Sequence, residues 1–252
     1  MSRRRFFVPP NHIAGRTARL PPEELHHARD VLRLAPGEVV EVFDGEGAGY
    51  AGRLEARESG WVVEDLEPIA ARTESPLDLV LALALVKANR FEWALEKATE
   101  LGVREIVPLA ARRSEIRIAA PKLPQKIERW RRIVREAAKQ CRREAVPRVE
   151  PPLAVEEYLA REAPETERLL FSELAAAPWD GRLGAARRVE VIIGPEGGWA
   201  AEETAAAQQA GCRITGFGPR ILRAETAAVA ALALVQFQAG DLSTAPSRKE
   251  SP

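Results

Sequence analysis

The chain has 252 residues, of which 46% are hydrophobic, and this is enough apolar material for one large or two small globular domains. Its 37 basic residues equal its 37 acidic residues in number, so a uniformly basic surface for nucleic acid is excluded. Two cysteines and three histidines without ligand spacing exclude a disulfide scaffold and a four-cysteine zinc site.

The first ten residues are basic but reach Pro9 and Pro10 after only three apolar residues. They therefore lack the apolar core of a signal peptide. The longest apolar runs, such as residues 77–86, are about half as long as a membrane span. We expect a reduced, cytoplasmic protein without a membrane segment.

The first quarter of the chain is predicted to be rich in β-structure. Residues 22–34 have the spacing of a helix, with one apolar face made of Leu25, Ala28, Val31 and Leu32. Short alternating segments separated by glycine turns then predict the strands of a small barrel or meander, at residues 38–43, 49–56 and 61–66. Residues 67–76 contain two prolines and predict a linker.

Beyond the linker, apolar runs alternate with helical patterns. The expected strands are residues 79–86, 105–109, 168–172, 189–193 and 213–217. The expected helices are residues 90–101, 122–143, 201–211 and 224–238. This alternation predicts an α/β fold with a mostly parallel sheet, followed by a disordered tail at residues 242–252.

Two glycine-rich loops follow two of these strands, at residues 194–198 and 216–219, with one helix between them. Ligands of parallel α/β sheets bind beyond the carboxyl ends of the strands, so the loops can line one site. Neither loop has a phosphate-binding glycine motif. The loops are either ordinary turns or a backbone-rich pocket for a ligand with a neutral head.

Three ordered segments resemble the bacterial 16S ribosomal RNA uridine-N3 methyltransferases, the ribosomal RNA small subunit methyltransferase E family. They are residues 90–103, 192–198 and 217–227. Shorter matches lie at residues 31–34 and 136–142, where Arg142 replaces an expected glycine. The resemblance covers nearly the whole chain.

The resemblance implies a PUA-like β-barrel domain at residues 1–72 and a SPOUT methyltransferase domain with a trefoil knot at residues 73–241. It also implies a homodimer that uses S-adenosylmethionine and acts on 16S ribosomal RNA or the 30S ribosomal subunit. The residues that it assigns to cofactor binding are Gly194, Pro195, Glu196, Gly197, Gly198, Phe217, Gly218, Pro219, Ile221, Leu222 and Thr226. No metal is implied.

Methylation of uridine N3 requires loss of its proton. With an imide pKa of about 9, forming the anion at pH 7 costs about 2.7 kcal/mol. Arg223, or alternatively Arg220, can stabilise the anion, and Glu225 or Glu196 can accept the proton. The alternative roles are an interface ion pair for the arginines and a first-turn helix carboxylate for Glu225.

Residues 111–148 contain thirteen basic and four acidic residues. This segment is either a solvated helix face or a surface for RNA phosphates. The expected RNA contacts are Arg3, Arg4, Arg5, Arg132, Arg135 and Lys139. Trp130 is expected in the core. Two rival functions remain open, a ribose 2′-O-methyltransferase of the SPOUT class and a non-catalytic ribosome assembly factor.

Overall fold

The computed structural model of the chain describes residues 4–58, 60–69, 73–184 and 186–243. It divides into two compact units. The first comprises residues 1–74 and 135–146, and the second comprises residues 75–134 and 147–252. The domain predicted from the sequence at residues 1–72 does not include the second segment of the first unit. Arg3 and all but the first two residues of the predicted tail lie outside the described residues.

The first unit is built on a curled six-stranded sheet with the order β1-β4-β5-β6-β3-β2. Its strands are β1 (Arg5–Phe7), β2 (Ile13–Ala14), β3 (Thr17–Arg19), β4 (Val39–Phe43), β5 (Gly49–Arg57) and β6 (Gly60–Ile69). Strand β1 pairs with β4 in parallel, and the other pairs are antiparallel. Side chains that alternate along the strands, such as Val40, Val42 and Leu54, form the core. The predicted β-rich first part is confirmed.

Helix α1 (Pro22–His26) continues into a π-helical turn (His27–Val31), and a 3₁₀ turn (Pro10–His12) precedes β2. The helix expected in residues 22–34 is therefore present, with Ala28 buried. Val31 was expected on the buried face, but its side chain is exposed. A π-helical turn contains more residues than an α-helical turn, so the side chains in and after it face other directions than an α-helix would give them.

The predicted linker begins too early, because β6 continues through Ile69. Pro68 pairs with Tyr50 of β5, while among the described residues β6 pairs with β3 at Val62 and Val63. A proline, which has no N–H to donate, is tolerated where one side of a strand is unpaired.

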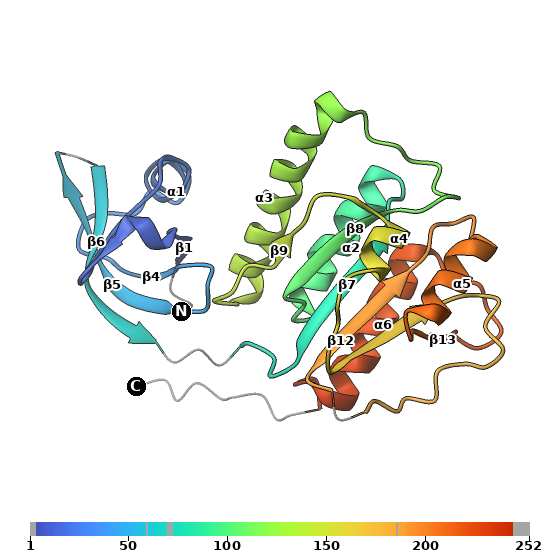
Figure 1. The fold of residues 1–252 in the computed structure, drawn as a ribbon. Helices are drawn as coiled ribbons and strands as arrows, with labels where there is room; N and C mark the ends of the chain where they lie inside the picture. Colours follow the sequence, from blue (N-terminus) through green and yellow to red (C-terminus); the bar gives the residue numbers. More distant parts are fainter. Residues whose placement is uncertain (1–3, 59, 70–72, 185, 244–252) are drawn as a thin grey trace. The chain divides into compact units, whose positions relative to one another are not determined.

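The second unit contains a seven-stranded sheet in which all the described pairings are parallel, as Figure 1 shows for its central strands β7 and β12. Its main path has the order β10-β8-β7-β12-β11-β13, and β9 pairs with β8. The strands are β7 (Asp78–Ala84), β8 (Glu105–Ala110), β9 (Arg148–Val149), β10 (Leu153–Ala154), β11 (Thr166–Phe171), β12 (Arg188–Ile193) and β13 (Arg213–Thr215). The predicted parallel α/β sheet is confirmed.

Helices cover both faces of this sheet. They are α2 (Ala88–Glu100), α4 (Val155–Leu159), α5 (Ala201–Gln209) and α6 (Ala224–Ala239). Helix α3 (Leu123–Cys141), which follows a 3₁₀ turn (Ala120–Lys122), contacts α2 through Trp130 and Phe91, and from residue 135 onward it belongs to the first unit. Helix α6 packs on β7, β12 and α2, whereas α4 contacts β8 and α5 contacts β13. Because side chains alternate between the faces of a strand, residues such as Val80 and Ile192 join the core on the α4 and α5 side.

Helix α3 ends where Arg142 adopts a φ of 69°. This left-handed conformation is the usual end of a helix and favours glycine. Arg142 therefore keeps the backbone conformation expected of the glycine that it replaces. Its side chain forms an ion pair with the buried Glu41 of the first unit. Trp130 is buried against Phe91, as predicted.

Candidate functional site

A pocket of about 420 Å³ lies at the carboxyl ends of β11, β12 and β13. Both predicted glycine loops line it, although β11 lies between the strands that they follow. A third loop after β11, residues 172–178, completes the pocket. This third loop was not predicted from the sequence, although ligands of parallel sheets bind beyond the carboxyl ends of the strands and β11 ends here as well.

The second and third loops are joined by main-chain hydrogen bonds. Ser172 N donates to Thr215 O at 2.8 Å, and Trp179 N donates to Gly216 O at 2.9 Å. A Cβ on Gly216 would stand 2.9 Å from the carbonyl oxygen of Ser172. Glycine is required at this position because no other residue permits such a close approach.

The rings of Phe171 and Phe217 stack at the pocket, with centroids 4.5 Å apart and an interplanar angle of 13°. Phe171 is buried at the end of β11 and Phe217 is partly exposed in the second loop. The stack gives the pocket an aromatic surface. Small residues of the third loop and of α6, including Ala176, Ala224 and Ala227, add to its apolar lining.

The first loop is held on its other side by the loop that follows β8. Gly197 lies against the backbone of Arg113, where a Cβ would stand 3.1 Å from the Arg113 oxygen. The Arg113 guanidinium also donates to Gly197 O at 3.3 Å. Gly198 has a φ of 69°. The close approach of Arg113 thus explains the glycine at position 197, and the left-handed backbone explains the glycine at position 198. Neither glycine is among the residues that line the pocket.

Most of the expected cofactor-binding residues line the pocket. They are Gly194, Pro195, Glu196, Phe217, Gly218, Pro219, Ile221 and Leu222. Thr226 is exposed on α6 and is not among the lining residues. Gly216, which the predicted second loop includes, also lines the pocket. Residues that line the pocket but were not expected are Phe171, Ser172, Glu173, Ala175, Ala176, Ala177, Pro178, Ala224 and Ala227.

The two candidate catalytic arginines also line the pocket. Arg220 and Arg223 are exposed, and Arg223 is the residue before the first turn of α6. Glu225, the first choice for proton acceptor, is not among the lining residues. Its carboxylate faces Arg90 of α2 with an N–O distance of 3.6 Å. The helix turn directs Glu225 to α2, so Glu196 is the candidate acceptor that the pocket retains.

A buried ion pair fixes β11 and β12 to each other below the site. Arg168 of β11 donates to Glu190 of β12 at 2.9 Å, and the hydroxyl of Tyr158 donates to the same carboxylate at 2.7 Å. All three side chains are buried. Burial, and then the charge of Glu190, raise the pKa of Tyr158, so the phenol stays protonated and remains a donor.

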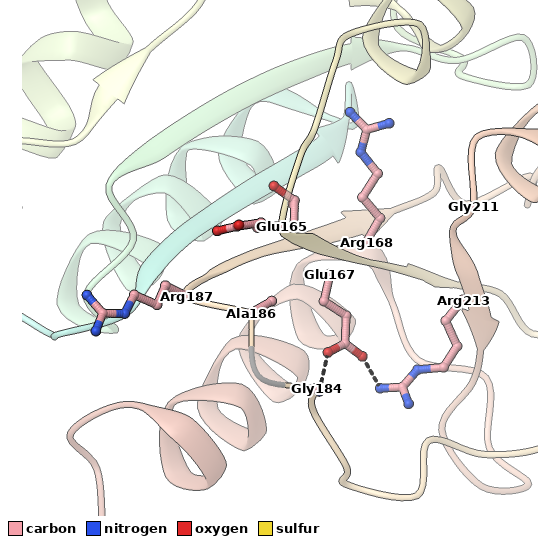
Figure 2. A pocket seen from close by; sticks show the side chains of 9 residues that line it. Glu165, Glu167, Arg168, Gly184, Ala186, Arg187, Gly211 and Arg213 are labelled. Carbon is pink, nitrogen blue, oxygen red and sulfur yellow. Dashed lines mark hydrogen bonds and ion pairs between the residues drawn. The ribbon is translucent and has the colours of Figure 1, made fainter.

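A second depression, of about 750 Å³, lies at the opposite edge of the same sheet (Figure 2). Charged side chains surround it, and Glu167 forms an ion pair with Arg213 at 2.6 Å and accepts a hydrogen bond from Gly184 N at 2.6 Å. It opens at the amino ends of β11, β12 and β13. Ligands of parallel sheets bind at the other edge, so this depression is not the candidate site.

The residues expected to contact RNA have different surroundings. Arg4 and Arg132 are exposed. Contrary to expectation, Arg5 is buried, and its guanidinium donates to Arg142 O and Arg143 O, each at 2.7 Å. These partners are nearly 140 residues away in the sequence, so no local pattern reveals them.

Arg135 and Lys139 form ion pairs inside the first unit. Lys139 contacts the buried Glu24 at 2.9 Å. Arg135 contacts Glu23 at 3.0 Å and lies over the ring of Phe7. Both side chains thus have structural partners within the unit, which weakens their case as phosphate contacts.

The described residues contain no group of three or more histidine, cysteine, aspartate or glutamate side chains that could hold a metal ion. Within the same residues, no helix has the length and apolar composition to cross a membrane.

Comparisons with known proteins cover both units. A family model for an RNA methyltransferase domain matches residues 73–236, and one for an RNA methyltransferase PUA domain matches residues 20–60. Ribosomal RNA small subunit methyltransferase E of a Synechocystis strain is 35% identical over 236 residues, which are 92% of this chain and 76% of that relative. The Bacillus subtilis protein of the same name is 29% identical, over 86% of this chain and 88% of its own length.

Solved structures agree with these matches. The Neisseria gonorrhoeae ribosomal RNA small subunit methyltransferase E, solved bound to S-adenosylmethionine, superimposes with a TM-score of 0.87 and 32% identity. The match covers 96% of this chain and all of that one. A Legionella pneumophila protein solved with the same cofactor gives a TM-score of 0.85 at 32% identity, with the same coverage of both chains.

Proposed function

Because this chain belongs to the ribosomal RNA small subunit methyltransferase E family, we propose that it transfers a methyl group from S-adenosylmethionine to N3 of a uridine in 16S ribosomal RNA. The observation that carries the proposal is the pocket formed by three loops at the carboxyl edge of the sheet. Its position and its backbone-rich lining suit a nucleoside cofactor without phosphates. The knot and the homodimer remain expectations from the family.

The lining of the pocket fits S-adenosylmethionine chemically. Phe217, stacked on Phe171, offers an aromatic surface to an adenine ring. The carboxylates of Glu173 and Glu196 can accept hydrogen bonds from an ammonium or from ribose hydroxyls. When bound, the cofactor supplies an electrophilic methyl group on a sulfonium.

The residues of the pocket must also promote the loss of the proton from the uridine N3. Arg223 lines the pocket and is exposed, so its guanidinium can donate to a uracil oxygen that gains negative charge as N3 is deprotonated. Arg220 is the alternative donor on the same loop. Glu196 can take the proton at a carboxylate oxygen and release it to water. Nitrogen then forms the new N–CH₃ bond as the S–CH₃ bond breaks, and sulfur keeps the electron pair.

Exposed apolar residues support the proposed homodimer. Trp93 of α2, and Leu234 and Phe237 of α6, have exposed fractions of 43%, 47% and 61%. Helices α2 and α6 pack against each other. Large exposed apolar side chains on neighbouring helices are typical of an interface with a second subunit. Light scattering of the wild type and of Phe237→Asp tests this, since the variant should shift to monomer.

The test of the function is methyl transfer from labelled S-adenosylmethionine to 30S subunits and to free 16S ribosomal RNA, followed by digestion and nucleoside analysis. We expect 3-methyluridine as the labelled product. A 2′-O-methylated nucleoside would instead identify the ribose as the target. Failure of the wild type to bind the cofactor in calorimetry would refute the enzymatic proposal as a whole.

A further inference from the structure

Two walls of the cofactor pocket come from strands that are not neighbours. The first loop follows β12 and the second follows β13, with β11 between them. Hydrogen bonds within the sheet therefore do not join these two strands directly. The distance between the walls depends in part on side chains that reach both.

Arg90 of α2 reaches both walls. Its Nη1 contacts Glu196 Oε1 of the first loop at 2.9 Å, and its Nε lies 3.6 Å from Glu225 Oε1, in the first turn of the helix that follows the second loop. The Arg90 side chain is 24% exposed and that of Glu225 is 13% exposed. Ion pairs with this degree of burial are screened less by solvent than surface pairs.

The backbone of Arg90 is firmly anchored. The next residue, Phe91, is buried and packs on Trp130, with ring centroids 4.8 Å apart. Ala94 and Leu95 of the same helix are also buried, and α2 packs along α6. Arg90 thus extends from a rigid helix toward two loops, and it does not itself line the pocket.

Glu225 depends on this contact. Its Oε2 is buried and has no hydrogen-bond partner among the described residues, while its Oε1 faces Arg90. Removing the guanidinium would leave a mostly buried carboxylate without a counter-charge, which is strongly unfavourable. It would also leave Glu196 and Glu225 as like charges without the cation between them.

We propose that Arg90 is a positioning residue that sets the separation of the two loops and thereby the affinity of the pocket for S-adenosylmethionine. The inference rests on the proposed function, because it assumes that this ligand occupies the pocket. It adds a role for a residue outside the pocket lining.

The test compares Arg90→Ala and Arg90→Lys with Arg129→Ala as a matched control. Arg129 forms an ion pair with Glu92, also on α2, at 2.6 Å, but neither residue lines the pocket. We measure the Kd for S-adenosylmethionine by calorimetry, kcat and KM for the cofactor, and the Tm. Arg90→Ala should raise Kd and KM at least tenfold. Arg90→Lys should lie between Arg90→Ala and wild type, since one ammonium keeps the charge but not the two-sided contact. Arg129→Ala should stay within twofold of wild type.

A Kd for Arg90→Ala within twofold of wild type would overturn the inference while leaving the proposed function intact. Equal losses in Arg90→Ala and Arg129→Ala would also overturn it, because the effect would then be general to α2. If Arg90→Ala does not fold, the Kd of the folded Arg90→Lys variant tests the inference instead. A wild-type Kd in Arg90→Lys would contradict the role of a contact to both loops. Absence of cofactor binding by the wild type would remove the proposed function and this inference together.

Discussion

The indole ring of Trp199 lies so close to Gly194 that a Cβ on the glycine would stand 2.9 Å from the ring carbon Cε2. The ring cannot easily move, because it is buried and its Nε1 donates to Phe171 O at 2.9 Å. Gly194 begins the first loop of the pocket and Phe171 ends β11. The Trp199 side chain therefore connects two strand ends at the site.

Gly194→Ala should consequently displace either Trp199 or the loop. We expect a loss of about 1–3 kcal/mol in the free energy of unfolding, as for other overpacked sites, and an increase of about tenfold in the Kd for S-adenosylmethionine. Urea denaturation and calorimetry measure the two effects. Gly184→Ala is the control, since its Cβ would stand 3.5 Å from the nearest atom, Glu167 Oε2. Wild-type affinity in Gly194→Ala would show that the loop tolerates the shift.

Arg223→Ala should slow the chemical step more than it weakens cofactor binding. Loss of one donor to a developing negative charge typically costs about a hundredfold to a thousandfold in rate. Single-turnover methylation measures the rate, and calorimetry measures the Kd, which we expect to change by less than about threefold. Arg220→Ala distinguishes the two arginines of the loop. If Arg223→Ala keeps the wild-type single-turnover rate, the role belongs elsewhere.

Glu190→Ala should strongly destabilise the second unit. It would leave Arg168 buried without its counter-charge and Tyr158 without its acceptor. Breaking a buried pair from one side costs about 3–5 kcal/mol, to be measured by urea denaturation. Arg57→Ala removes the exposed pair with Glu64 and should cost less than about 1 kcal/mol. Similar losses in the two variants would contradict the structural role of the buried pair.

Cys212 should make the stability sensitive to alkaline pH. Burial raises the pKa of its thiol to about 11. The folded protein then holds a proton that the unfolded chain releases above about pH 9, so the contribution of the thiol is complete below pH 9 and is lost as the pH rises through 11. The loss is at most about 3 kcal/mol at 1.36 kcal/mol per unit.

The measurement is the free energy of unfolding at pH 8.5 and 10.5 for wild type and Cys212→Ala, because other groups titrate in this range in both proteins. The wild type should lose more stability than the variant. Cys141→Ala, at the half-buried cysteine, should behave as the wild type does. Equal slopes for wild type and Cys212→Ala would disprove the assignment.

Arg132→Ala should reduce the dependence of RNA affinity on salt. Each phosphate contact contributes a slope of about −0.7 to −0.9 to a plot of the logarithm of the binding constant against that of salt concentration. Filter binding of 16S ribosomal RNA at several salt concentrations gives the slope. Arg131→Ala is the control, since Arg131 is paired with Glu128 at 2.9 Å. An unchanged slope for Arg132→Ala would leave Arg132 as a merely solvated side chain.

The sequence predicted the parts of the fold that have strong local patterns. The apolar run around Leu81 and the helical stripe around Trp130 are examples, because burial on two faces or on one stripe is visible in the sequence. The short strands β9 and β10 were missed, since two residues carry no periodicity. Pro68 suggested a linker. Whether β6 can contain a proline depends on which strand lies beside it at that position, and the sequence does not show this.

Part of the site was predictable from the rule that ligands of parallel sheets bind beyond the carboxyl ends of the strands. It located the loops at Gly194 and Gly216, and it would have located the loop after Phe171 had it been applied there. The direction of the Glu225 side chain was not predictable, because it depends on the position of Arg90 on another helix. The burial of Arg5 was not predictable either, since its hydrogen-bond partners lie far away in the sequence, just after the end of α3.

The first unit is assembled from two separate stretches of chain, and residues 135–146 supply it with carbonyl acceptors for Arg5 and a cation for Glu41. A fragment that stops at residue 74 would lack the carbonyl acceptors of Arg5 and the cation that pairs with Glu41, and both side chains would lose the cover of residues 135–146. The first unit is therefore not a cassette that can be excised at one point and fused to another protein. Any transplant must carry the end of α3 with it.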